Sequence, residues 1–367
     1  MIRRLLTLCS VIVLVFIVTF GWAALAVRQW YRGFAGSEAF VEIPRGTSRH
    51  SIAHRLQDAG IVRHWYLFEA YSLWNIHHPL EAGEYRFEEG ASAEGAFWKI
   101  AMGHVYVRTI VVPEGWTKFD IAAALEHAGI CSREDFLAAV KDTASVHQLA
   151  PGALNLEGYL FPATYQFSRQ QTARDVAASM VSRFSNEWTR LAAAPSVHAR
   201  YPGSPVPGIN MTLEGVVTIA SLIERETPQP RERPLVASVF YNRLARGLPL
   251  QCDPTVQYAL ELAGHPTTQL TLRDLQYDSP YNTYRYSGLP PGPIANPGQA
   301  SLRAALAPAH TDYLYFVANA QGGHFFSNTL AGQNRNVAMY RRRLAGESDV
   351  PVPSAVARHG KRRRQQG

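Results

Sequence analysis

The sequence predicts an α+β protein in three parts: an N-terminal transmembrane helix, a small α+β module and a larger mixed α+β domain. Three observations support this fold class. A long uncharged apolar run stands near the N-terminus, short alternating strand patterns bounded by turn residues recur along the chain, and amphipathic helical patterns separate them. Hydrophobic residues make up 47% of the 367 residues, which is enough for a folded core.

The apolar run covers residues 5–27 and reads LLTLCSVIVLVFIVTFGWAALAV. About 20 apolar residues cross the hydrocarbon layer of a membrane as a helix, so this run is long enough to span it. A cleaved signal peptide is the alternative, because AALAV offers small residues, but apolar regions of signal peptides are usually about 7–15 residues long. The arginines within residues 1–4 favour a cytoplasmic N-terminus. Residues 28–39 form a linker.

Residues 40–104 are expected to form the small α+β module. FVEIP alternates like a strand and ends at a Pro-Arg-Gly turn, two helices follow, EAGEYRF returns as a second strand, and a third helix ends at Gly103. The predicted helices cover residues 51–59, 65–74 and 93–102.

Residues 105–345 are expected to form the larger domain. It opens with the strand VYVRTIVV, and near its end DYLYFVAN and HFFSN indicate a hairpin around a Gly-Gly turn. Thr212 is the expected N-cap of the helix that contains TIASLIERET. The predicted helices cover residues 117–128, 132–140, 172–195, 213–226, 234–245, 301–308 and 333–345. Residues 346–367 have no periodicity and are predicted to be a basic, disordered tail.

The charge pattern and the missing motifs exclude several classes of function. The formal charge of +7 comes from arginines in residues 1–4 and from the basic tail, so the rest of the chain is balanced and predicts no nucleic-acid surface. HExxH, GxSxG and GxxxxGK[ST] are absent, and no Cys/His cluster indicates a metal or another cofactor. Cys131 and Cys252 form one disulfide in an oxidising compartment or stay free thiols.

The stretch TIASLIERET, residues 218–227, has a carboxylate directly after a buried helical stripe. Residues three and four apart share a helix face, so Glu224 lies beside small side chains that leave a groove above it. Apolar walls raise the pKa of a carboxyl group, and a protonated glutamate in a cleft suits general acid catalysis on a glycosidic oxygen. Alternatively, Glu224 ends the helix and pairs with an arginine. Glu226 is about 200° further around the helix, so we expect it to point elsewhere. Its expected partner is one of Arg225, Arg231 or Arg233.

Six stretches of the chain resemble one family, the endolytic murein transglycosylases (YceG-like). They are PEGWTKFDIA, LEGYLFPATY, VASVFYNRL, GLPLQCDPTVQYAL, YDSPYNTYRYSGLPPGPIANPG and YLYFVANAQGGHFFSN. The N-terminal span and the small module, which resembles a LysM module, match the family as well. The resemblance implies that Glu224 is the catalytic acid. It also implies cleavage between N-acetylmuramic acid and N-acetylglucosamine without water, because the C6 hydroxyl attacks and leaves a 1,6-anhydro end. One glutamate then serves as acid and later as base, and neither a second carboxylate nor a cofactor is needed.

Eight further residues are candidates for binding the glycan: Glu157, Tyr165, Gln251, Asp253, Asn282, Tyr284, Tyr286 and Asn328. Each also has a structural interpretation. Asp253 precedes a proline at the start of a helix and is equally an N-cap. The three candidates in the long loop either contact sugars through amides and aromatic rings or pack the loop. Glu157 and Tyr165, both in LEGYLFPATY, either close the cleft or join the domains.

Two functions follow from the resemblance. The first is an enzyme anchored in the inner membrane, with its N-terminus in the cytoplasm and its catalytic domain in the periplasm, that cuts nascent glycan strands and terminates their elongation. The second is a non-catalytic scaffold that uses the LysM-like module to hold peptidoglycan near the synthesis machinery. Both imply glycan strands and penicillin-binding wall synthases as partners. The intact Glu224 motif favours the enzyme.

Overall fold

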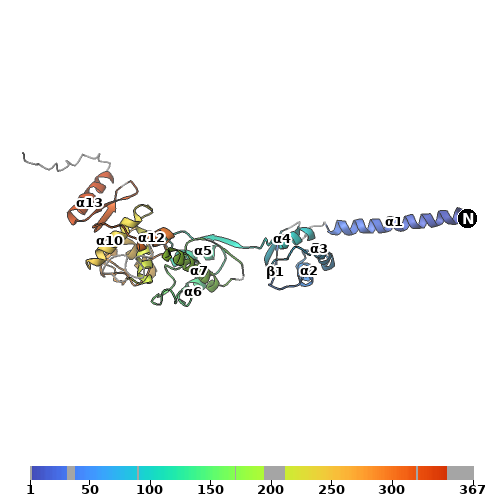
Figure 1. Cartoon of the computed structure of the whole chain (residues 1–367), viewed down its shortest axis with the longest axis horizontal. Helices are drawn as coiled ribbons and strands as arrows, with labels where there is room; N and C mark the ends of the chain where they lie inside the picture. Colours follow the sequence, from blue (N-terminus) through green and yellow to red (C-terminus); the bar gives the residue numbers. More distant parts are fainter. Residues whose placement is uncertain are drawn as a thin grey trace, which may run out of the picture. The chain divides into compact units, whose positions relative to one another are not determined.

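The structure is a computed structural model of the 367-residue chain, and it has a mixed α+β fold (Figure 1). It describes residues 2–30, 38–88, 91–169, 171–193, 211–319 and 321–344, with side chains in the first helix described only over residues 11–25. The basic tail predicted at 346–367 therefore lies outside the described residues. The chain divides into two compact units. The first contains residues 1–110 and 165–171, and the second contains residues 111–164 and 172–367.

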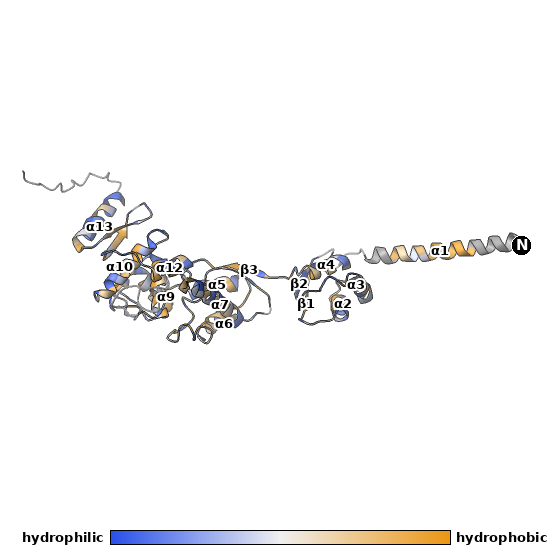
Figure 2. Ribbon diagram, in the orientation of Figure 1, coloured by the Kyte–Doolittle hydropathy of each residue, from blue (hydrophilic) through white to orange (hydrophobic). Residues whose placement is uncertain are grey.

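The apolar run of residues 5–27 lies within one continuous helix, α1 (Ile2–Trp30). The large apolar side chains from Val11 to Leu25 are more than half exposed, and Figure 2 colours this part of the helix as hydrophobic. Among the residues that the structure describes, no helix meets the length and apolarity needed to cross a membrane. The helix is thus confirmed, and the transmembrane anchor remains a prediction.

The small module has the predicted order of strand, two helices, strand and helix. Its elements are β1 (Ala39–Ile43), α2 (Arg49–Asp58), α3 (Trp65–Trp74), β2 (Gly83–Phe87) and α4 (Ala93–Ala101). The two strands are antiparallel, with Val41 opposite Tyr85. The side chains of Phe68, Tyr85 and Phe97 are fully buried between the strands and the helices, and they form the centre of one core cluster. The likeness of the module to LysM remains a prediction.

The second unit is mainly helical. Its helices are α5 (Lys118–His127), α6 (Arg133–Ala139), α7 (Ala173–Ala192), α9 (Leu213–Glu226), α10 (Arg233–Ala245), α11 (Asp253–Leu262), η1 (Asp274–Gln276), α12 (Gln299–Leu306) and α13 (Leu330–Leu344). The predicted hairpin is present as the antiparallel strands β5 (Tyr315–Ala318) and β6 (His324–Ser327). The division between the two units passes through the paired strands β3 (Arg108–Val111) and β4 (Thr164–Phe167).

Helix α9 lies at the centre of the second unit and packs against α10, α11 and α12. It begins where expected, because the Thr212 side chain accepts a hydrogen bond from the Gly215 amide. Every residue from Val216 to Ile223 is buried, so the helix is covered on all sides and not along a single stripe. Both carboxylates at its C-terminal end, Glu224 and Glu226, therefore face protein on opposite sides of the helix.

Candidate active site

Glu226, in the last turn of α9, faces a cavity of about 430 Å3 in the second unit. That volume is within the usual range of small-ligand sites. One wall of the cavity is apolar and comes from residues 315–318 of β5. The other walls carry polar side chains from five separate segments, among them Glu226, Arg243, Gln251, Asp253, Tyr284 and His324. Three of the predicted binding residues are thus brought together with Glu226.

The carboxyl group of Glu226 is in a site that favours its protonated form. Its pKa is raised to about 7, mainly by burial and in part by the nearby charge of Asp253, while a hydrogen bond from the Cys252 thiol opposes the shift. A carboxyl group with a pKa near neutrality can hold a proton and release it at the pH where a general acid works best.

Asp253 is the second carboxylate of this cavity. It is the first residue of α11, with Cys252 in the N-cap position, so the interpretation of Asp253 as the N-cap is wrong. The Tyr284 hydroxyl donates a hydrogen bond to Asp253 Oδ1. This bond and burial both raise the pKa of the Tyr284 hydroxyl, which therefore stays protonated as the donor.

The loop that carries Tyr284 is held by Asn282, which is fully buried. The Asn282 side chain donates to the carbonyls of Leu275 (3.1 Å) and Tyr277 (2.7 Å) and accepts from the Tyr284 amide (3.0 Å). These bonds use both ends of its amide group. Asn282 therefore positions the loop, and the packing interpretation describes it better than sugar contact.

Gln251 is the one non-glycine residue of the described ranges with a positive φ, at 52°. Side chains other than glycine seldom adopt this conformation, and such backbone strain is concentrated at functional sites. The Gln251 side chain accepts a hydrogen bond from the buried guanidinium of Arg243. Arg243 also donates to the carbonyls of Pro249 (2.8 Å) and Leu314 (2.9 Å), so it joins α10 to two walls of the cavity.

Glu224 has different surroundings, and its side chain is only 5% exposed. Its Oε1 accepts from Arg233 Nη2 at 2.8 Å, and its Oε2 accepts from the Gly298 amide at 2.9 Å. Burial raises the pKa of Glu224, whereas the Gly298 bond and the Arg233 charge oppose that shift. Both oxygens are thus used to tie α9 to α10 and to the start of α12. Arg233, named above as a partner for Glu226, pairs with Glu224, so that prediction is wrong.

Comparisons with known proteins match this chain over most of its length. The model of the YceG-like family matches residues 41–339. The chain belongs to the YceG-like family. It is 34% identical over 316 residues to an endolytic murein transglycosylase of Bacillus subtilis, covering 82% of this chain and 84% of that protein. It is 31% identical over 327 residues to the protein of that name from Streptococcus pneumoniae, covering 81% of this chain but 57% of the relative.

A solved structure supports the family assignment at the level of the fold. The 2.6 Å crystal structure of a YceG-like protein from Listeria monocytogenes aligns with a TM-score of 0.54 and 33% sequence identity. The alignment covers 82% of this chain and 99% of that one. The fold described above is thus that of the family.

The remaining predicted site residues of this YceG-like chain lie apart from the Glu226 cavity. Glu157 is buried and accepts hydrogen bonds from the Lys118 amide, the Tyr258 hydroxyl and the Asn296 side chain. The Tyr286 hydroxyl donates to Asp278 at the surface. Asn328 is exposed after β6, and Tyr165 is buried in the first unit against Phe167. Cys131 and Cys252 are both free thiols.

Glu226 and Arg243 line this cavity, and neither was among the site residues predicted from the sequence. The helical wheel predicted only that Glu226 points away from the groove and pairs with an arginine. The side of α9 that carries Glu226 is also covered by protein, because the helix is buried on every side. The run from Val216 to Ile223 has no charged residue and no polar group larger than the hydroxyls of Thr218 and Ser221, and this was the signal that could have indicated it.

Proposed function

We propose that this YceG-like protein is a lytic transglycosylase of peptidoglycan. It cuts the bond between N-acetylmuramic acid and N-acetylglucosamine within nascent strands, leaves 1,6-anhydro ends and terminates glycan elongation. The family membership and the names of the relatives support the reaction class. The observation that carries the proposal is Glu226, a carboxyl group with a pKa of about 7 at the wall of a cavity that also holds Asp253 and Tyr284.

Glu226 is proposed as the proton donor, in preference to Glu224. A general acid must reach the leaving oxygen of the substrate with a proton to transfer. Glu226 lines an open cavity and favours its protonated form. The oxygens of Glu224 are both occupied, by a guanidinium and by a backbone amide. The sequence motif alone favoured Glu224, and paired glutamine substitutions decide between the two.

The reaction needs one carboxyl group to act twice. Glu226 donates its proton to the glycosidic oxygen as the bond breaks, and the resulting carboxylate accepts the proton of the C6 hydroxyl as that oxygen attacks the anomeric carbon. The leaving strand thereby gains a hydroxyl group, and the other strand ends in a 1,6-anhydro ring. Asp253, fixed by the Tyr284 hydroxyl, is near enough to stabilise the positive charge that develops on the sugar.

The products test this mechanism directly. Purified glycan strands are incubated with the full chain, and the released fragments are weighed by mass spectrometry. We expect fragments that end in 1,6-anhydro-N-acetylmuramic acid, which are lighter by one water than reducing ends. Reducing ends would overturn the transglycosylase mechanism, because Glu226 and Asp253 together are also the pair that a hydrolase needs.

The enzyme is further proposed to act at the inner membrane, anchored by residues 5–27 with its N-terminus in the cytoplasm and the rest in the periplasm. The uncharged run of 23 residues and its exposed apolar side chains support the anchor. The LysM-like module of residues 40–104 is proposed to hold the glycan, and wall synthases are proposed as partners. A scaffold without catalysis remains the alternative, and the Glu226 cavity favours the enzyme.

A further inference from the structure

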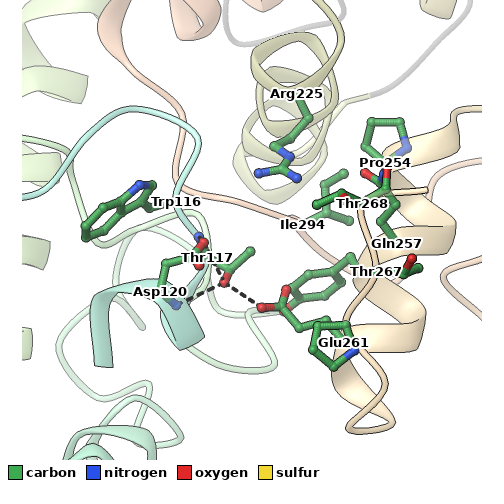
Figure 3. Close-up of a pocket in the computed structure, with 12 residues that line it drawn as sticks. Trp116, Thr117, Asp120, Arg225, Pro254, Gln257, Glu261, Thr267, Thr268 and Ile294 are labelled. Atoms are coloured by element: carbon green, nitrogen blue, oxygen red, sulfur yellow. Dashed lines mark hydrogen bonds between the residues drawn. The ribbon is translucent and has the colours of Figure 1, made fainter. Parts of the chain in front are cut away.

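A second cavity, of about 630 Å3, lies in the second unit and is lined by side chains that the proposed reaction does not use (Figure 3). Arg225 points toward it from the end of α9, and the half-buried Trp116 stands before the first turn of α5. Its polar walls come from α5 and α11 and include Thr117, Asp120 and Glu261. The cavity thus combines an aromatic ring, a guanidinium and two carboxylates.

The two carboxylates share one hydroxyl group. The Thr117 side chain is 3.1 Å from Asp120 Oδ2 and 3.2 Å from Glu261 Oε1, and the Thr117 amide donates to Asp120 Oδ2 at 2.9 Å. A threonine hydroxyl carries one proton, so it serves one carboxylate at a time. No other hydrogen-bond donor within the described ranges contacts either carboxylate. The pair therefore has acceptor capacity left for a ligand with several donors.

The charges of the cavity favour a cation beside this pair. Burial and the neighbouring charge of Asp120 raise the pKa of Glu261, and they outweigh the Thr117 hydrogen bond and the charges of Arg225 and Lys118, which lower it. An ammonium group between the two carboxylates removes that repulsion and offers three donors. Arg225 donates to the Gly115 carbonyl at 3.1 Å and leaves other donors facing the cavity, where they suit a carboxylate of the same ligand.

Buried hydrogen bonds behind the cavity hold the wall that carries Glu261 in place. Tyr258, which lines the cavity one turn before Glu261, accepts a hydrogen bond from buried Lys118 (2.9 Å) and donates to buried Glu157 (3.0 Å). The carbonyl of Trp116 accepts from both the amide and the side chain of Asn296. These bonds hold the cavity in shape before any ligand binds, which lowers the entropic cost of binding.

The linings of the two cavities include two pairs of consecutive residues. Arg225 and Glu226 on α9 line different cavities, as do Asp253 and Pro254 on α11. A polymer cut at Glu226 must extend past the ends of these helices. Peptidoglycan carries a peptide branch on each N-acetylmuramic acid, so a branch next to the cut bond lies within reach of the second cavity.

We propose that the cavity of Trp116, Asp120, Arg225 and Glu261 binds the peptide branch of the glycan strand, with the branch's free ammonium group held between Asp120 and Glu261. This rests on the proposed function, because only a strand bound at Glu226 brings its branches to this place. The site makes the enzyme selective for strands whose peptides keep a free amine.

The test compares two substrates cut by the full chain: glycan strands with free peptide amines, and the same strands after acetylation of those amines. The kcat/KM for each is measured from the released fragments. We expect the parent to favour the free amine about tenfold, roughly the effect of one charge-assisted hydrogen bond. Glu261→Gln and Asp120→Asn, which keep size and a hydrogen-bond acceptor, should bring this ratio close to one.

Glu134→Gln removes an equal charge from an exposed position on α6 and should leave the tenfold preference intact. Circular dichroism checks that each variant is folded. If either Glu261→Gln or Asp120→Asn does not fold, the other still tests the site. Equal cleavage of both substrates by the parent overturns the inference alone. So does a preference that survives in Glu261→Gln and Asp120→Asn. A parent that cleaves neither substrate overturns the proposed function together with the inference.

Discussion

Glu224 and Glu226 are two residues apart on α9, and of the two cavities described above Glu226 lines one and Glu224 lines neither. Glu224 is held by Arg233 and by the Gly298 amide, whereas Glu226 stands beside Asp253 with a pKa raised to about 7. One helix end thus carries two carboxyl groups in different surroundings, and those of Glu226 support its proposed role as the proton donor. The surroundings differ because different segments pack on the two sides of α9. A glutamine substitution should therefore lower mainly kcat at Glu226 and mainly stability at Glu224.

Replacing Glu226 with Gln keeps its size but removes the transferable proton. We expect kcat for strand cleavage to fall by about 10²–10⁴-fold, the usual contribution of a general acid. Glu224→Gln is the matched control. It breaks a buried ion pair with Arg233, so it should lower the free energy of unfolding by about 3 kcal/mol and reduce kcat far less. Fragment release and thermal melts measure the two effects. The reverse pattern would return the catalytic role to Glu224.

The order of the elements could be predicted from the sequence because each depends on local signals. The Thr212 cap, the strand patterns and the Gly-Gly hairpin all determine structure over a few residues. The resemblance also indicated Gln251, Asp253 and Tyr284, which do share a cavity.

The surroundings of the two glutamates could not be predicted in this way. Those of Glu224 include Arg233 and Gly298, which are 9 and 74 residues away and reach it only through tertiary packing. The same holds for Asn282, whose buried bonds to its own loop give it a positioning role that no spacing rule indicates.

The anchor prediction concerns residues 5–27. If this run is an uncleaved transmembrane helix, the protein stays with the membrane fraction after a high-salt wash, because hydrophobic insertion does not depend on charge. Mass analysis of the purified protein should then recover a chain that retains residues 1–27. Release by salt, or a mature chain that begins near residue 27, would exclude the anchor and favour a cleaved signal peptide.

The module prediction concerns residues 40–104. Deleting them should weaken binding to glycan strands, because the deletion removes a proposed glycan contact while every residue that lines the Glu226 cavity remains. Affinity is best measured in chains that also carry Glu226→Gln, so that the strands stay uncut during the titration. Equal affinity with and without the module would indicate that it binds a protein partner.

The Arg243 prediction concerns the hydrogen bonds that hold the walls of the Glu226 cavity in place. Its guanidinium donates to Pro249, Leu314 and Gln251 at once, and lysine cannot reproduce this planar arrangement. Arg243→Lys should destabilise the fold by about 1–3 kcal/mol, because buried acceptors lose their donors. It should also raise KM, since Gln251 loses the bond that holds its side chain at the cavity. Thermal melts and steady-state kinetics check both effects. An unchanged KM would mean that Gln251 makes no contact with the glycan.

The pH dependence of cleavage distinguishes the two glutamates without removing either. Glu226 donates a proton, so only its protonated form is active, and kcat/KM should fall as the pH rises through about 7. The charge of Asp253 helps to raise that pKa. Asp253→Asn removes the charge, so the descending limb of the pH profile should move to lower pH while the Tyr284 hydroxyl keeps an acceptor. Asp253 is not among the groups that shift the pKa of Glu224, which responds to Gly298, Arg233 and Glu114. If Glu224 were the acid, the same substitution would leave the limb where it is.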